Sequence, residues 1–183
     1  MRCRLEDFEQ GGYYHVYNHA VDEVELYRES DDYQYYLEKV DQYLNRKDFE
    51  VCCCCLMSNH FHFLVYQKSD KIVSSVFNSL NLSYVNHYNS KYKRKGKLYS
   101  DRLQHKKIEG GDYLQRLCLY IHLNPVKDGF VKKPEDWEFS DYSRWINHDV
   151  RLRNELFFLD KDEYRELVEE QVRSQVNPPG TAS

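Results

Sequence analysis

The chain has 183 residues, 41% of them hydrophobic and 31% charged, with a formal net charge of −4 and only seven glycines and four prolines. This composition excludes a disordered or fibrous chain and predicts one soluble globular domain, long enough to fold without disulfides. No apolar run approaches the roughly 20 residues of a membrane span. The charged opening Met1–Asp7 is not a signal peptide, so we expect a cytoplasmic protein with no membrane partner.

Six cysteines would suggest a disulfide framework in a small secreted protein, but four of them, Cys52–Cys55, are consecutive. Neighbouring strand residues face opposite ways, so these four cannot easily pair with one another. They also lack the Cys-x-x-Cys spacing of a zinc site. We therefore expect small, buried, apolar side chains in a reducing compartment.

The first elements in chain order are a strand and a helix. Periodicity predicts a strand over Tyr13–Asn18, and the acidic Ser30-Asp31-Asp32 predicts the start of a helix. The helix carries apolar residues at helical spacing, and this stripe needs a sheet to pack on: Tyr33, Tyr36, Leu37, Val40, Tyr43 and Leu44.

Two short β-rich runs follow, Glu50–Met57 and His60–Tyr66. Ser58-Asn59 separates them and predicts a tight hairpin. A second helix is expected from near Asp70, with its buried side formed by Ile72, Val73, Val76, Phe77, Leu80 and Tyr84.

One more strand completes the pattern. It is expected within Leu98–Ile108, and Gly110-Gly111 marks a break after it. The resulting order, βαββαβ, predicts an α+β protein of the ferredoxin-like type, in which helices cover one face of an antiparallel sheet.

Further helices are expected after this sheet. A third helix should run over about Asp112–Asn124, because Asp112 can cap its start and Pro125 removes a backbone donor at its end. The aromatic residues Trp137, Phe139 and Tyr142 should pack over the domain. A charged helix is expected over about Lys161–Arg173.

Two histidines in the predicted hairpin are candidate metal ligands. His60 and His62 lie two residues apart in a strand, so both imidazoles point from the same face of the sheet. Each can give a lone pair to one cation, which makes the pair half of a metal site. Considered alone, a His-x-His pattern has an alternative role as a structural or solvent-facing pair.

The third helix carries a second candidate pair, Tyr120 and Asn124. A separation of four residues places both on one helix face, about one turn apart. The phenol can act as a nucleophile and the amide oxygen as a third metal ligand, provided that the helix docks on the histidine face of the sheet. Asn124 can instead cap the helix end before Pro125.

Four motifs in a fixed order resemble one known family. They are Tyr14–Asn18 (Tyr-His-Val-Tyr-Asn), Met57–Val65, Tyr120–Gly129 and Asp136–Tyr142. Together they resemble the single-tyrosine HUH transposases of the insertion-sequence type, and most closely the REP-associated tyrosine transposase branch. In this motif Phe61 is the bulky residue between two metal-binding histidines.

The resemblance implies a transposase that cleaves and rejoins single-stranded DNA at hairpins. Tyr120 would attack the scissile phosphate and remain attached as a 5′-phosphotyrosine, which conserves the bond for transfer to another DNA end. His60, His62 and Asn124 would hold a divalent cation, Mg²⁺ or Mn²⁺. The catalytic domain would span residues 1–150, with residues 151–175 as its helical extension and 176–183 as a disordered tail.

A net charge of −4 is weak evidence for DNA binding, but the charge is unevenly distributed. Between Asn86 and Lys107 only Asp101 is acidic, whereas eight residues are basic: Lys91, Lys93, Arg94, Lys95, Lys97, Arg102, Lys106 and Lys107. This run is a candidate surface for DNA phosphates, with stacking from Tyr88, Tyr92 and Tyr99; a solvated loop is the alternative.

Three other residues are secondary candidates. His15 is expected to be packed or to face a phosphate, and His19 stands where the resembled family usually has an arginine. Arg116, one turn before Tyr120, can approach a phosphate. His122 lies on a different helix face from Tyr120 and is not assigned to the site.

Other activities stay open at this point. A metal-dependent nuclease would use the same ion with water as nucleophile, and a retired transposase would bind hairpins without cleaving them. A replication-initiator nickase would share the chemistry but usually has further domains. The protein can act as a monomer or as a homodimer.

Overall fold

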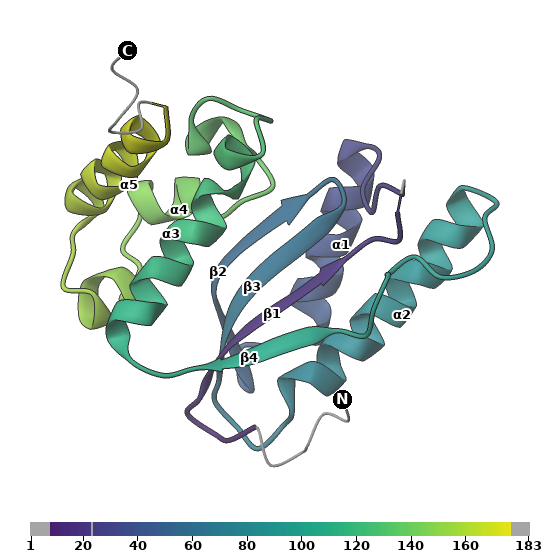
Figure 1. Ribbon diagram of the computed structural model, residues 1–183. Helices are drawn as coiled ribbons and strands as arrows, with labels where there is room; N and C mark the ends of the chain where they lie inside the picture. The colour runs from purple at the N-terminus through teal and green to yellow at the C-terminus, as the bar shows by residue number, and fades with distance from the viewer. Residues whose placement is uncertain (1–7, 23, 177–183) are drawn as a thin grey trace. The chain divides into compact units, whose positions relative to one another are not determined.

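The computed structural model describes residues 8–22 and 24–176 (Figure 1). The chain divides into two compact units, which meet in the sequence between Glu109 and Gly110. Among the described residues, no helix is both long and apolar enough to cross a membrane.

The first unit is a four-stranded antiparallel sheet with two helices. Its strand order is β2-β3-β1-β4, and every neighbouring pair is antiparallel. This confirms the predicted α+β fold with βαββαβ order. The elements are β1 (Tyr13–His19), α1 (Ser30–Tyr43), β2 (Phe49–Met57), β3 (His60–Gln67), α2 (Val73–Lys91) and β4 (Gln104–Ile108).

Both helices cover the same face of the sheet, as Figure 1 shows. Tyr36 of α1 and Phe77 of α2 pack against Phe61 and Phe63 of β3, with ring centroids 5.2–6.4 Å apart. Burying such rings removes large apolar areas from water and is the main stabilising contribution here. The alternating residues of β3, His60 and His62, therefore belong to the opposite face.

The register of the sheet decides which residues join the histidines. In β1, Tyr17 pairs with His62 and His19 pairs with His60. A β-bulge at Cys52 interrupts the pairing of β2 with β3, so Val51 pairs with Val65 and Cys53 with Leu64. The five described cysteines are buried and form no disulfide, as predicted.

The second helix begins later than predicted, at Val73 rather than near Asp70. The side chain of Gln67 explains where it starts, because its Oε1 accepts a hydrogen bond from the Val73 N–H at 3.2 Å. This bond satisfies one of the N–H groups that a first helical turn leaves without an intrahelical partner.

A buried carboxylate ties α1 to the end of α2. Asp32 is 0% exposed and accepts hydrogen bonds from Lys91 Nζ at 2.7 Å and from the Tyr92 hydroxyl at 2.6 Å. The backbone N–H groups of Arg28 and Glu29 also donate to it. Burial alone raises the pKa of this carboxyl, but these donors outweigh burial and hold the pKa below its usual value.

Replacing Asp32 with asparagine should lower the free energy of unfolding by about 2–3 kcal/mol at pH 7, because four donors lose a charged acceptor. Since the folded-state pKa is depressed, this contribution is present above the unfolded-state pKa and is lost as pH falls through the folded-state pKa. Urea unfolding at pH 7 and pH 3 measures both effects. The exposed neighbour Asp31, changed to asparagine, is the control. An equal loss in both variants would contradict the assignment.

The second unit is helical. Its elements are α3 (Gly111–Lys127), the 3-10 turn η2 (Pro134–Asp136), α4 (Tyr142–Asn147), the π-helical turn η3 (Leu152–Leu156) and α5 (Lys161–Val176). α5 begins at Lys161, as predicted. Of the predicted disordered tail, residues 177–183 lie outside the described part of the chain, and Val176 ends α5.

The predicted end of the third helix was wrong. α3 starts at Gly111, so Asp112 lies in its first turn instead of capping it, and α3 continues through Pro125 to Lys127. Proline at this position removes a single intrahelical donor, and the last turn keeps a bond from Asp128 N to Asn124 O at 2.9 Å. Beyond the helix, the Phe130 N–H donates to the Pro125 carbonyl.

The core of the second unit is organised around His122, which is fully buried. Its Nδ1 lies 2.8 Å from the Tyr164 hydroxyl of α5, and its Nε2 lies 3.1 Å from Asp141 Oδ1. Trp145 packs edge-on against the same ring. His122 therefore joins three segments of this unit, in agreement with its exclusion from the predicted site.

Candidate active site

The two histidines of β3 lie side by side. The ring centroids of His60 and His62 are 5.1 Å apart, with 73° between the ring planes, and both side chains are buried. Two imidazole nitrogens at about 2.1 Å from a common ion can be accommodated at this spacing. The predicted metal-ligand pair is therefore brought together by the strand.

Each ring has a neighbour at its Nδ1 atom. His60 Nδ1 lies 2.7 Å from Asn59 Oδ1, which can only accept, so His60 Nδ1 carries the proton and its Nε2 keeps a lone pair. His62 Nδ1 lies 3.0 Å from His15 Nε2. Partners of this kind fix the tautomer and orientation of metal-binding histidines.

His15 is suited to accept the proton of His62. Burial, and secondarily the positive charge of Lys106, lower the pKa of His15 to about 4, so its imidazole is neutral. With His15 accepting at Nε2, His62 donates from Nδ1 and its Nε2 keeps a lone pair. Lys106 is the β4 residue that pairs with His15.

Tyr120 and Asn124 lie one turn apart on α3. Tyr120 is 40% exposed, which is unusual for a large aromatic side chain here, whereas Asn124 is buried. Asn124 Nδ2 donates to the Tyr120 carbonyl at 3.0 Å. The Asn124 amide is thereby oriented with its nitrogen toward the helix, which leaves Oδ1, the atom able to bind a cation, directed elsewhere.

The four predicted catalytic and metal-binding residues thus occur as two pairs. His60 and His62 belong to the first unit, and Tyr120 and Asn124 belong to the second. Within the described part of the chain, no three His, Cys, Asp or Glu residues are grouped to hold a metal ion. The two imidazoles of the first unit are neutral donors, which fit a divalent cation that is also held by substrate phosphate.

Five residues of the basic run lie in the loop between α2 and β4, here called the basic loop: Lys93, Arg94, Lys95, Lys97 and Arg102. Lys91 ends α2, whereas Lys106 and Lys107 lie in β4. Lys93 adopts a left-handed backbone with φ of 50°, and Gly96 has φ of 97°. Asn89 fixes this turn, because its carbonyl accepts from Arg94 N and its side chain donates to the Gly96 carbonyl. In the part of the chain described, no ion pair involves Lys93, Arg94, Lys95, Lys97 or Arg102.

Some members of the predicted basic surface have internal partners. Lys91 pairs with Asp32 and Glu29, and Lys107 pairs with Glu9 and Glu109. The three tyrosines predicted to stack on bases also have internal partners, and Tyr88 is fully buried. Their hydroxyls make internal hydrogen bonds, Tyr88 to the Glu25 carbonyl, Tyr92 to Asp32 and Tyr99 to Asn81.

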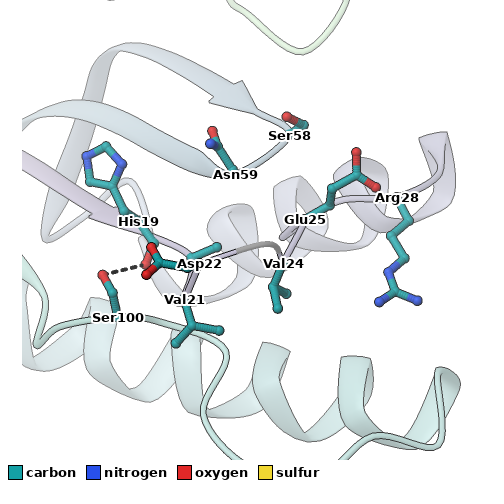
Figure 2. A pocket seen from close by; sticks show the side chains of 10 residues that line it. His19, Val21, Asp22, Val24, Glu25, Arg28, Ser58, Asn59 and Ser100 are labelled. Atoms are coloured by element: carbon teal, nitrogen blue, oxygen red, sulfur yellow. Dashed lines mark hydrogen bonds between the residues drawn. The ribbon is translucent and has the colours of Figure 1, made fainter.

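A cavity of about 880 Å³ lies where β1 leaves the sheet (Figure 2). Asn59, the partner of His60, forms part of its wall, so the cavity adjoins the histidine pair. The carboxylates of Asp22 and Glu25 and the guanidinium of Arg28 also face it. Carboxylate acceptors disfavour a phosphate but suit the amino groups of base edges.

Comparison with known proteins identifies the family. Residues 10–124, a segment that includes both residue pairs, match a family model of transposases. The model is described as "Transposase IS200 like", and because it covers more than half of the chain, the chain belongs to the IS200-like transposase family. This confirms the resemblance based on the four motifs. A comparison with curated protein sequences gives no match.

One solved structure is similar in fold. It is described as a REP-associated tyrosine transposase bound to a REP hairpin. The sequences are 19% identical, the TM-score is 0.67, and the match covers 78% of this chain and 84% of the other. At this identity the likeness shows the shared fold.

Sequence reasoning missed two residues of the site. Asn59 was interpreted only as part of a turn, although its side chain orients His60. His15 was expected to be packed or to face a phosphate, and the structure buries it against His62, a contact that was not predicted. His15 and Tyr17 lie two residues apart in β1 and therefore on one face of the sheet. This spacing could have placed His15 on the histidine face, once the strand pairing was known.

Proposed function

We propose that the protein is a transposase that cleaves and rejoins single-stranded DNA at hairpins through a 5′-phosphotyrosine. The observation that carries this proposal is an exposed Tyr120 on α3 within a matched IS200-like segment that also contains the histidine pair. The hairpin-bound structural neighbour supports a hairpin substrate. We further propose that the catalytic domain spans residues 1–150, with residues 151–175 as its extension.

The proposed reaction is an in-line displacement at phosphorus. The Tyr120 oxygen forms a bond to the scissile phosphorus, the phenol proton is lost, and the bond to the 3′ oxygen breaks to release a 3′-hydroxyl. In the second step a 3′-hydroxyl attacks the phosphotyrosine, which restores the phenol and joins the DNA. Because each step exchanges one phosphodiester for another, the reaction needs no ATP.

We propose that His60, His62 and Asn124 bind Mg²⁺ or Mn²⁺. When bound, such an ion neutralises phosphate charge and orients the attacked phosphorus. Asn59 and His15 hold the two imidazoles so that Nε2 of each ring is the ligand atom. The reaction requires that the two histidines and the pair of Tyr120 and Asn124 act on the same phosphate. The two pairs can belong to one chain or to two copies of it.

Incubation with single-stranded hairpin DNA and Mn²⁺ or Mg²⁺ tests the proposal. A protein–DNA adduct that survives denaturant is the expected product. Cleavage without an adduct would indicate a metal-dependent nuclease, and hairpin binding without cleavage on several hairpins and both metals would indicate a retired transposase.

The basic loop is proposed to bind the hairpin backbone. Changing Lys93, Lys95 and Lys97 together to glutamine should weaken hairpin binding and reduce the slope of log K against log salt by about 0.9 for each lost phosphate contact. Fluorescence anisotropy over a salt series measures this. Lys47, an exposed lysine of the same unit, changed to glutamine is the matched control. An unchanged slope in the triple variant would refute the assignment.

A further inference from the structure

The face of α3 that carries Tyr120 also carries two basic side chains. Arg116 precedes Tyr120 by four residues and Lys127 follows it by seven, which are one and two helical turns. All three side chains are exposed. The nucleophile candidate is therefore flanked by a cation on each side along the helix.

Contacts within the helix position both cations beside aromatic rings. Lys127 Nζ lies 5.4 Å from the Tyr120 ring centroid, and Arg116 Cζ lies 5.9 Å from the ring centroid of Tyr113. Cation–π contacts of this length are weakly favourable at exposed sites and leave the N–H donors accessible. The rings thus limit where each cation lies without neutralising it.

In the part of the chain that the structure describes, neither cation forms an ion pair with a carboxylate, although Asp112 is one turn before Arg116 and Asp128 is next to Lys127. Other arginines of this unit do pair, Arg151 with Glu155 at 2.9 Å and Arg165 with Asp162 at 3.0 Å. The charge on this face of α3 is available to an external anion.

We infer that Arg116 and Lys127 bind phosphates of the single strand on either side of the phosphate that Tyr120 attacks, so that the strand follows the axis of α3. That single-stranded DNA is the substrate rests on the proposed function. Arginine and lysine contacts to phosphate position a strand without reading its sequence. This surface belongs to the helical unit, whereas the basic loop belongs to the first unit.

Salt-dependent binding tests the inference with the full chain. The probe is an unstructured single-stranded oligonucleotide in EDTA, so that no cleavage occurs. The slope of log K against log salt should fall by about 0.7 for Arg116→Gln, by the same amount for Lys127→Gln, and by about 1.4 for the double variant. Lys127→Arg should keep the wild-type slope. Lys132→Gln, an exposed lysine outside this face, is the control.

The outcomes separate this inference from the proposed function. Wild-type slopes in all variants would overturn the strand path along α3, even if Tyr120 forms an adduct. An equal fall in Lys132→Gln would also overturn it, because the effect would then be a general loss of charge. The third outcome is that only the Arg116 and Lys127 variants reduce the slope, while the wild type forms no adduct in the cleavage assay. This result would support the binding surface and refute the transposase chemistry.

Discussion

Replacement of Tyr120 with phenylalanine should reduce formation of the covalent DNA adduct by more than about 10³-fold, because the attacking oxygen is lost. The hairpin affinity should stay at the wild-type value. Asn124 bonds to the backbone carbonyl of residue 120 rather than to its side chain, so this contact survives the substitution. Gel electrophoresis in denaturant measures the adduct with labelled hairpin DNA.

Tyr113 provides the matched control. It lies on the same helix, seven residues before Tyr120, and Arg116 lies over its ring, which phenylalanine keeps. Tyr113→Phe should form the adduct at the wild-type rate. A wild-type adduct yield in Tyr120→Phe would show that another tyrosine is the nucleophile.

The second large effect is expected at the histidine pair. His60→Ala and His62→Ala should each reduce metal-dependent cleavage by at least about 10²-fold, because an ion-binding imidazole contributes several kcal/mol. Hairpin binding should be retained, since the proposed phosphate contacts lie elsewhere. Cleavage rates over a Mn²⁺ or Mg²⁺ titration measure the effect. Asn59→Ala should instead weaken the apparent metal affinity by about 10–100-fold, because it only orients His60.

Two further measurements show which role is lost with cleavage and whether one chain or two form the site. If hairpin binding disappears together with cleavage, the separate roles assigned to the histidines and the basic loop are refuted. Mixing Tyr120→Phe with His62→Ala asks whether one chain supplies both residue pairs. Restored cleavage in the mixture would show that two copies share the site, whereas a persistently inactive mixture would show that each copy acts alone.

The sheet was predictable from the sequence because side chains of one kind recur at every second residue, which is the period of a strand. Phe61 and Phe63 alternate with the two histidines, and the covered and opposite faces followed from that alternation. The end of α3 was not predictable in the same way. Pro125 is a strong local signal, but the hydrogen bonds around the last turn are kept and α3 continues two residues beyond it.

The candidate site was predictable where residues are close in sequence and not where they meet through tertiary structure. The spacings of His60 with His62 and of Tyr120 with Asn124 place each pair on one face of its element. His15 contacts His62 across 47 residues of chain, a pairing that depends on strand register. Lys91 carries the same charge as Lys93, and only the structure shows that Asp32 accepts its hydrogen bonds.

The hydrogen bond from His60 to Asn59 has a consequence for how this protein tolerates sequence change. Turn positions of hairpins usually accept many polar residues. Here the turn residue also orients a proposed metal ligand, so we expect the Asn59→Ala variant to fold as well as the wild type and still bind metal poorly. Stability screens would classify residue 59 as permissive, whereas a screen for DNA transfer would classify it as restricted.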